Sequence, residues 1–180
     1  MQNRTPRKPE QPIPNQTAFD ARLTVELASV VAVARRRALR DGGRQIDTAH
    51  LLHSLIEADP EVREAFDGGP RLAKVLGYLV QRSIGYGLRW QGAVEDSGAV
   101  PLVRGAAADG WSPAALAAME DALSRAGLRG APRATGLDLL AALTVDAECR
   151  AVEVLAGAGV DAAWLAERAV RRTAEAPRAV

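Results

Sequence analysis

The signals that start and stop helices occur twice along this chain, in the same order and at an offset of 88 residues, the separation of Thr24 and Ser112. Both residue types cap helix N-termini, because their side-chain oxygen accepts a hydrogen bond from a free backbone N–H. The same offset aligns Ala34, Arg37, Ala38, Gly42, Leu51, Leu52 and Leu55 with Ala122, Arg125, Ala126, Gly130, Leu139, Leu140 and Leu143. Cap, glycine stop and leucine cluster therefore repeat together. We predict an all-α fold: a duplicated four-helix repeat, about eight helices, with pseudo-twofold symmetry.

Each repeat contains four segments whose apolar residues recur at helical spacing. The expected signals of the first repeat are caps at Thr24, Asp47 and Asp59-Pro60, and stops at residues 42–43 and 68–70. Those of the second are caps at Ser112-Pro113, Thr135 with Asp138 three residues on, Asp146 and Asp161, and a stop near Gly127 or Gly130.

Three segments lack such patterns. Residues 1–18 hold four prolines and little apolar surface, which predicts a disordered arm. Residues 85–110 hold six glycines and read as a linker, with a possible short strand pair at 88–94 and 100–103. Residues 173–180 are expected to be frayed. The first repeat is thus assigned to residues 19–84 and the second to residues 111–172.

Composition narrows the class of protein. The 23 basic and 22 acidic residues give a net charge of +1, which argues against a dedicated nucleic-acid or membrane surface. No apolar run is long enough to span a bilayer, and no signal peptide opens the chain. The single cysteine, Cys149, excludes an intramolecular disulfide. A cytoplasmic protein is expected.

A motif opens the second helix of each repeat. The first copy reads Ile46-Asp47-Thr48-Ala49-His50-Leu51-Leu52, and the second runs from Ala134 to Leu140. The second repeat closes with Val154-Leu155 and then Gly159-Val160-Asp161. Over residues 19–172 these features resemble the Clp N-terminal repeat domain of Clp-type AAA+ unfoldases, whose motif reads Ile-Gly-Thr-Glu-His-Leu-Leu.

The resemblance implies a non-catalytic binding protein that is accessory to the Clp protease system. One version is an adaptor or regulator that contacts the Clp ATPase or its client proteins. The other is a decoy that sequesters peptide-like antibiotics, such as hydrophobic cyclic peptides, that target the unfoldase N-domain. The alternative is a regulatory or nucleic-acid-associated protein that only borrows the fold.

Two departures from the family matter. The sequence contains no GxxxxGK[ST] phosphate loop, so we expect a stand-alone N-domain without an ATPase module. The motif glutamates, which recognise phosphorylated arginine in some members, are replaced by Ala49 and Leu137. Neither side chain can pair with a guanidinium, so phosphoarginine recognition is predicted to be lost.

The candidate ligand-binding residues flank the two matched helix starts. They are Phe19, Leu23, Thr24, Trp111, Ser112 and Glu120. In a duplicated fold these starts are expected to lie near one another, with Phe19 and Trp111 as the floor of a peptide-binding groove. Alternatively, the two aromatic residues staple their helices to the core.

Other chemistry has weaker support. His50 and His53 share a helix face but lack a third ligand, so no metal or other cofactor is expected, and His50 matches the family histidine, for which a structural role is favoured. No catalytic triad is visible, so we do not expect an enzyme.

Cys149 either packs as a small apolar residue or is a reactive thiol at a helix start. The basic cluster Arg35, Arg36, Arg37, Arg40 and Arg44 either contacts nucleic acid or is a solvated helix face. The oligomeric state stays open.

Overall fold

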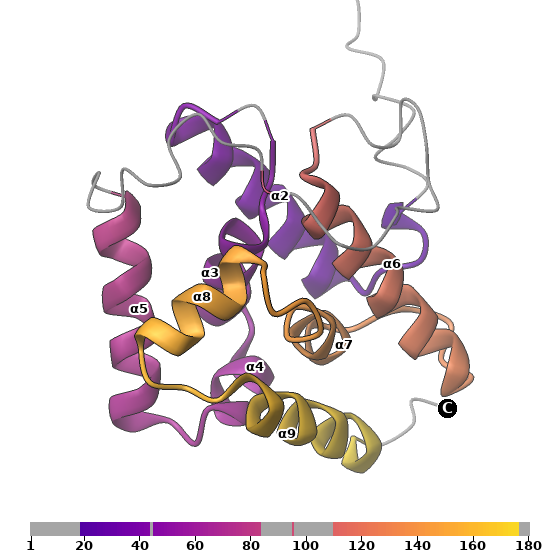
Figure 1. Cartoon of the computed structure of the whole chain (residues 1–180). Coiled ribbons are helices and arrows are strands. Elements are labelled where there is room, and N and C mark those ends of the chain that lie inside the picture. Colours follow the sequence, from indigo (N-terminus) through magenta and orange to yellow (C-terminus); the bar gives the residue numbers. More distant parts are fainter. Residues whose placement is uncertain (1–18, 44, 84–94, 96–109, 177–180) are drawn as a thin grey trace, which may run out of the picture.

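The computed structural model describes residues 19–43, 45–83, 95 and 110–176. Within these ranges the chain forms eight helices and no named strand, which confirms the all-α prediction (Figure 1). The helices of the first repeat are α2 (Val25–Arg40), α3 (Thr48–Ala58), α4 (Pro60–Ala65) and α5 (Gly69–Ser83). Those of the second are α6 (Pro113–Leu128), α7 (Gly136–Ala142), α8 (Arg150–Gly157) and α9 (Ala162–Glu175).

Side-chain caps start most helices where the sequence predicts them. Oxygens of Thr24, Asp47, Asp59, Ser112, Thr135 and Asp161 each accept a backbone N–H in the first turn that follows. The prediction for Asp146 is wrong: α8 has Cys149 at its N-cap, with no side-chain cap bond. The Asp146 carboxylate instead accepts the N–H of Glu148 in the preceding turn.

The offset of 88 residues holds in three dimensions for the first half of each repeat. Adding 88 to the first and last residue numbers of α2 gives those of α6, and adding 88 to the first residue number of α3 gives that of α7. After each leading helix a glycine adopts a positive φ, 75° at Gly42 and 70° at Gly130, which lets the chain turn back. Gly130, rather than Gly127, is therefore the stop of α6. The later helices of the two repeats drift from this register.

The contacts between the repeats have pseudo-twofold symmetry. Leu23 forms an isolated parallel bridge with Ala134, and Ile46 forms one with Trp111. The offset converts the first pair into the second. The helix packing follows the same exchange, since α3 packs on α8 as α7 packs on α4, and α5 packs on α8 as α9 packs on α4.

A side-chain contact repeats with its acidic residue on the other partner helix. In the first repeat, Nε2 of His50 on α3 lies 3.3 Å from a carboxylate oxygen of Asp41, the residue that ends α2. In the second, Asp138 on α7 pairs with the guanidinium of Arg129, which ends α6, with one N–O distance of 3.0 Å. These positions correspond at the 88-residue offset. The turn between the first two helices is thus held by the same contact in both repeats.

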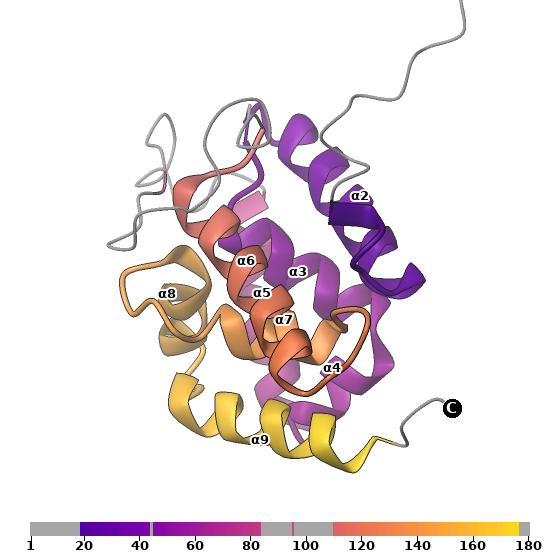
Figure 2. The ribbon, with the colours of Figure 1, turned by 90° about the vertical axis from the view of Figure 1, so that its right-hand side faces the viewer.

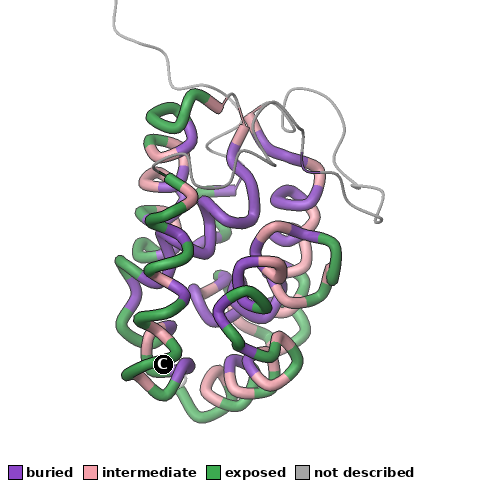
Figure 3. The backbone as a smooth tube through the Cα atoms, turned by 60° about the vertical axis from the view of Figure 1, so that its left-hand side comes forward, coloured by how far each residue is buried: buried purple, intermediate pink, exposed green. Residues whose placement is uncertain are grey.

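The two repeats share one hydrophobic core. Its fully buried side chains come from both halves and include Leu27, Phe66, Met119 and Leu139. Figure 3 colours the buried stretches of the backbone purple. Helix α9 lies along one end of the molecule, packed against α4 and α7 (Figures 1 and 2). Because the core crosses the boundary between the repeats, the free energy of folding depends on both copies.

Some predictions fall outside the described residues. These are the arm over residues 1–18, the strand pair at 88–94 and 100–103, and most of the linker. At the other end, α9 continues to Glu175, so the first three residues of the segment expected to be frayed are helical. Of the helices in the described ranges, none has the length and apolar character that a membrane span requires.

Candidate functional site

The two bridges define a seam between the repeats. Four backbone hydrogen bonds form it: Thr24 N–H to Ala134 O (3.0 Å), Ala134 N–H to Arg22 O (2.9 Å), Ser112 N–H to Ile46 O (2.8 Å) and Ile46 N–H to Gly110 O (2.9 Å). Each leading helix therefore starts directly beside the motif of the other repeat. Leu23 and Thr24 thus pair with the motif of the second repeat, and Trp111 and Ser112 pair with that of the first. That these residues form a ligand site stays a prediction.

The aromatic candidates meet at this seam. The rings of Phe19 and Trp111 are tilted at 53° with centroids 6.0 Å apart, a favourable aromatic geometry. Their exposed fractions are only 9% and 5%. Most of their surface thus packs inside the protein, as the stapling alternative expects, and their role in ligand binding stays a prediction.

The remaining candidates differ in exposure. Leu23 and Ser112 are buried, whereas Thr24 and Glu120 are half-buried. Glu120 is eight residues further along α6 than Ser112, which is about 12 Å along the helix axis. It therefore stands apart from the bridge, on the same helix.

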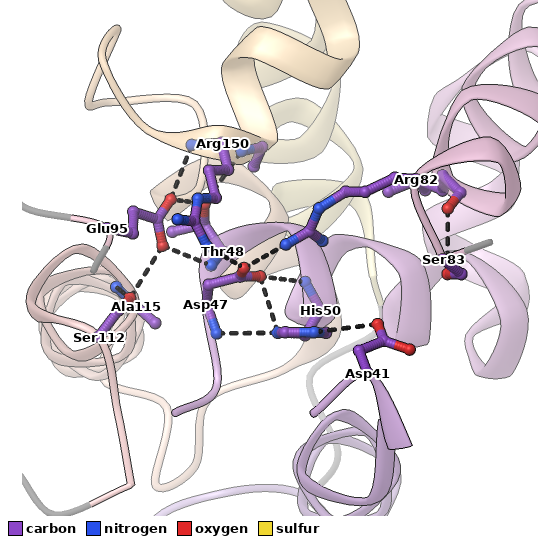
Figure 4. Close-up of polar contacts among 12 residues, drawn as sticks. Asp41, Asp47, Thr48, His50, Arg82, Ser83, Glu95, Ser112, Ala115 and Arg150 are labelled. Atoms are coloured by element: carbon purple, nitrogen blue, oxygen red, sulfur yellow. Dashed lines mark hydrogen bonds and ion pairs between the residues drawn. The ribbon is translucent and has the colours of Figure 1, made fainter. Parts of the chain in front are cut away.

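A buried polar cluster lies against the seam (Figure 4). Its centre is Asp47, which caps α3 by accepting the His50 N–H at 2.7 Å. The same carboxylate pairs with Arg82 from α5 and with Arg150 from α8, the latter at 2.7 Å. The cluster therefore joins helices of both repeats through charge-assisted bonds.

The charge on Asp47 is stabilised by its partners. Burial alone would raise the pKa of this carboxyl, but the hydrogen bonds from His50 and the charge of Arg82 outweigh it and hold the pKa well below its usual range. Asp47 thus stays ionised under ordinary conditions. Its partners keep a buried negative charge at the start of α3, where the helix dipole favours it.

A second carboxylate enters the cluster from the inter-repeat segment. Glu95 is 5% exposed and accepts hydrogen bonds from Thr48, Ser112 and Arg150. These residues begin α3, α6 and α8 respectively. One side chain therefore contacts three helix starts.

Both histidines contact neighbouring groups of the fold. Nδ1 of His50 accepts the backbone N–H of Asp47 at 3.1 Å, which completes a capping box. Nε2 of His53 lies 3.1 Å from a carboxylate oxygen of Glu57. Burial, and then the charge of Arg37, lower the pKa of His53. In the part of the chain that the structure describes, no three potential ligands are grouped as a metal site requires.

Cys149 packs as a small apolar residue. Its side chain is 1% exposed, and burial raises the pKa of the thiol. Of the two alternatives for Cys149, the structure therefore favours packing over a thiol that the helix start activates.

The arginines of the cluster on α2 differ in exposure. Arg37 pairs with Glu57 on α3, and Arg35 is half-buried against the backbone of Gly110. Arg36 and Arg40 are exposed, and Arg44 lies outside the described residues. The exposed part of the cluster fits the solvated-face interpretation.

The positions of the family glutamates are apolar and inaccessible. Ala49 is fully buried and Leu137 is 2% exposed. Neither offers a carboxylate to a guanidinium, and both contribute to the core instead.

Comparison with solved structures identifies the fold. Over 87% of this chain and 96% of the other, it superposes on the crystal structure of the N-terminal domain of the Caseinolytic protease associated chaperone ClpD from Arabidopsis thaliana, with a TM-score of 0.60 and 18% identity. The chain has a Clp N-domain-like fold. A second structure, from preliminary structural investigations of a malarial protein secretion system, matches over 86% of this chain and 97% of its own, with a TM-score of 0.61 and 14% identity. No family model matches the sequence, and no curated protein does.

The polar cluster was not predicted from sequence, apart from the capping roles of Asp47 and Ser112 and the structural role of His50. Arg82 and Arg150 stand 35 and 103 residues from Asp47. Glu95 is an acidic residue in a glycine-rich segment with no periodicity. The sequence contains no local signal that would join these residues.

Proposed function

We propose that this chain is a non-catalytic protein-binding module, accessory to the Clp protease system, that acts as an adaptor or regulator. The observation that carries the proposal is the symmetric seam, to which both repeats contribute the same backbone pairing within a Clp N-domain-like fold. The partner would be a Clp ATPase or its client proteins, and the compartment would be the cytoplasm.

The first-repeat side of the seam offers the more accessible surface. Thr24 is half-buried, and Val25, which follows it at the start of α2, is 76% exposed. Glu120 adds a charge on α6. Val25 and Glu120 lie outside the buried core, so substitutions at these two positions probe binding.

The test is the affinity of the full chain for the Clp ATPase of the same organism, measured by biolayer interferometry. Val25→Ser and Glu120→Arg are each expected to weaken binding about fivefold or more, the equivalent of about 1 kcal/mol. The matched controls are Leu128→Ser, an exposed apolar residue at the far end of α6, and Glu167→Arg on α9. Equal loss in probes and controls, or no binding at all, would refute the proposal.

The decoy version depends on the aromatic pair. Phe19 and Trp111 are in contact at the seam, and the motif glutamates are absent. Calorimetric titration with a hydrophobic cyclic peptide antibiotic that targets Clp N-domains should then give heat that Trp111→Ala abolishes. Trp164→Ala on α9 is the control. The absence of heat with the unsubstituted chain removes the decoy version and leaves the adaptor version standing.

Loss of phosphoarginine recognition is part of the proposal, because Ala49 and Leu137 stand where the family has glutamates. Titration with free phosphoarginine is expected to give no saturable binding up to millimolar concentration. The nucleic-acid alternative predicts instead a gel shift with duplex DNA that falls steeply with salt.

A further inference from the structure

Glu95 is surrounded by donors. Its Oε2 accepts the Thr48 backbone N–H at 2.9 Å and the Ser112 hydroxyl at 2.8 Å. Its Oε1 accepts the Thr48 hydroxyl and the Arg150 backbone N–H, the latter at 2.7 Å. An ionised carboxylate accepts about four hydrogen bonds and donates none. Each of the four groups that face it here is a donor, so the match is complete.

Glu95 also orients the two hydroxyls. The Ser112 oxygen accepts the Ala115 N–H at 3.1 Å, and the Thr48 oxygen accepts the Ala151 N–H at 2.9 Å. A hydroxyl has a single proton. Because each gives that proton to Glu95, its lone pair is directed at the helix amide. The carboxylate thus supports α6 and α8 through the hydroxyls, and it contacts α3 and α8 directly through the Thr48 and Arg150 backbone N–H groups.

This arrangement breaks the pseudo-twofold symmetry. Thr24 is the counterpart of Ser112 in the first repeat, and it caps α2 through the Leu27 N–H at 3.3 Å. Thr24 is half-buried, whereas Ser112 is 1% exposed beneath Glu95. The two sides of the seam are therefore distinct: Glu95 covers the side at Ser112.

We propose that Glu95 is a latch that couples the two repeats. Helix α3 belongs to the first repeat, and α6 and α8 belong to the second, so one carboxylate from the segment between them holds three helix starts closed together. Opening of any one start disturbs the acceptor that the others share. The device is independent of which partner the seam binds.

The test is amide hydrogen exchange, measured by NMR on the full chain with Glu95→Gln. The glutamine amide group places N–H donors against donors, so about half of the acceptor set is lost. Exchange is expected to accelerate together, about tenfold, at the four latched amides: Thr48, Ala115, Arg150 and Ala151. Exchange at the Trp164 N–H, capped by Asp161 on α9, should stay unchanged. Glu167→Gln is the matched control.

A second variant separates the branches of the latch. Thr48→Val removes the hydroxyl that links Glu95 to Ala151 and keeps the size of the side chain. It should accelerate exchange at Ala151 more than at Ala115, and it tests the latch even if the Glu95 variant does not fold. The proposal is overturned if Glu95→Gln changes only the two amides that contact it directly, or changes none. It is equally overturned if Thr48→Val leaves Ala151 exchange unaltered.

Discussion

Replacement of Asp47 by alanine gives the sharpest test of how the repeats are held together. Its carboxylate caps α3 and pairs with Arg82 and Arg150. Its side chain is 3% exposed, and those of the two arginines are 15% and 12% exposed. Asp47→Ala therefore leaves two largely buried guanidinium groups without this partner.

The magnitude follows from two contributions. Breaking a buried ion pair by removing one partner costs about 3–5 kcal/mol, and the lower end applies because both guanidiniums keep some access to water. Loss of an N-cap adds about 1 kcal/mol. We expect Asp47→Ala to lower the free energy of unfolding by about 4 kcal/mol. For a chain of this length that corresponds to a fall in Tm of about 8–16 °C.

The matched control is Asp161→Ala. Asp161 caps α9 through the Trp164 N–H in an exposed position, so its loss should cost about 1 kcal/mol. Both variants are compared by urea unfolding followed by circular dichroism. If Asp47→Ala costs no more than Asp161→Ala, the ion pairs contribute nothing and the reasoning is refuted.

Three further predictions concern packing, pH and reactivity. A Cβ on Gly136 would lie 2.0 Å from Oδ2 of Asp59, so Gly136→Ala should lower the free energy of unfolding by about 2 kcal/mol, measured by urea unfolding. A Cβ on Gly127 in α6 would meet no atom within 4 Å, so Gly127→Ala should raise the same quantity by up to about 1 kcal/mol. Burial lowers the pKa of His53 in the folded chain below its ordinary 6.5, so below that pH the unfolded chain binds more protons than the folded chain. The free energy of unfolding is therefore full above pH 6.5 and declines below it. His53→Gln should flatten this decline in urea unfolding. Cys149 should resist a thiol-specific chromogenic reagent in native buffer and react fully in denaturant; rapid native labelling would contradict its burial.

Local signals predicted much of the fold. Capping depends on residues three positions apart, so Asp47, Ser112 and Asp161 could be recognised from sequence alone. The duplication was visible because the cap and the glycine stop repeat at one offset. The prediction for Asp146 failed because its carboxylate accepts the Glu148 N–H two residues on, an Asx-type bond that competes with capping of α8.

The site was less predictable. The symmetry placed Trp111 and Phe19 near each other, but their burial depends on the complete core. Glu95 is 47 residues from Thr48 and 55 from Arg150, so its role arises only when three helix starts converge. Long-range polar contacts of this kind leave no periodic trace in one sequence.

The central claim is that the seam between the repeats is where a partner docks. Hydrogen exchange of the chain, free and bound to the Clp ATPase, tests it most directly. The account predicts protection on binding in residues 22–25, the side of the seam that Glu95 leaves uncovered. Protection confined to the outer helices α5 and α9, with no change at the seam, would contradict it.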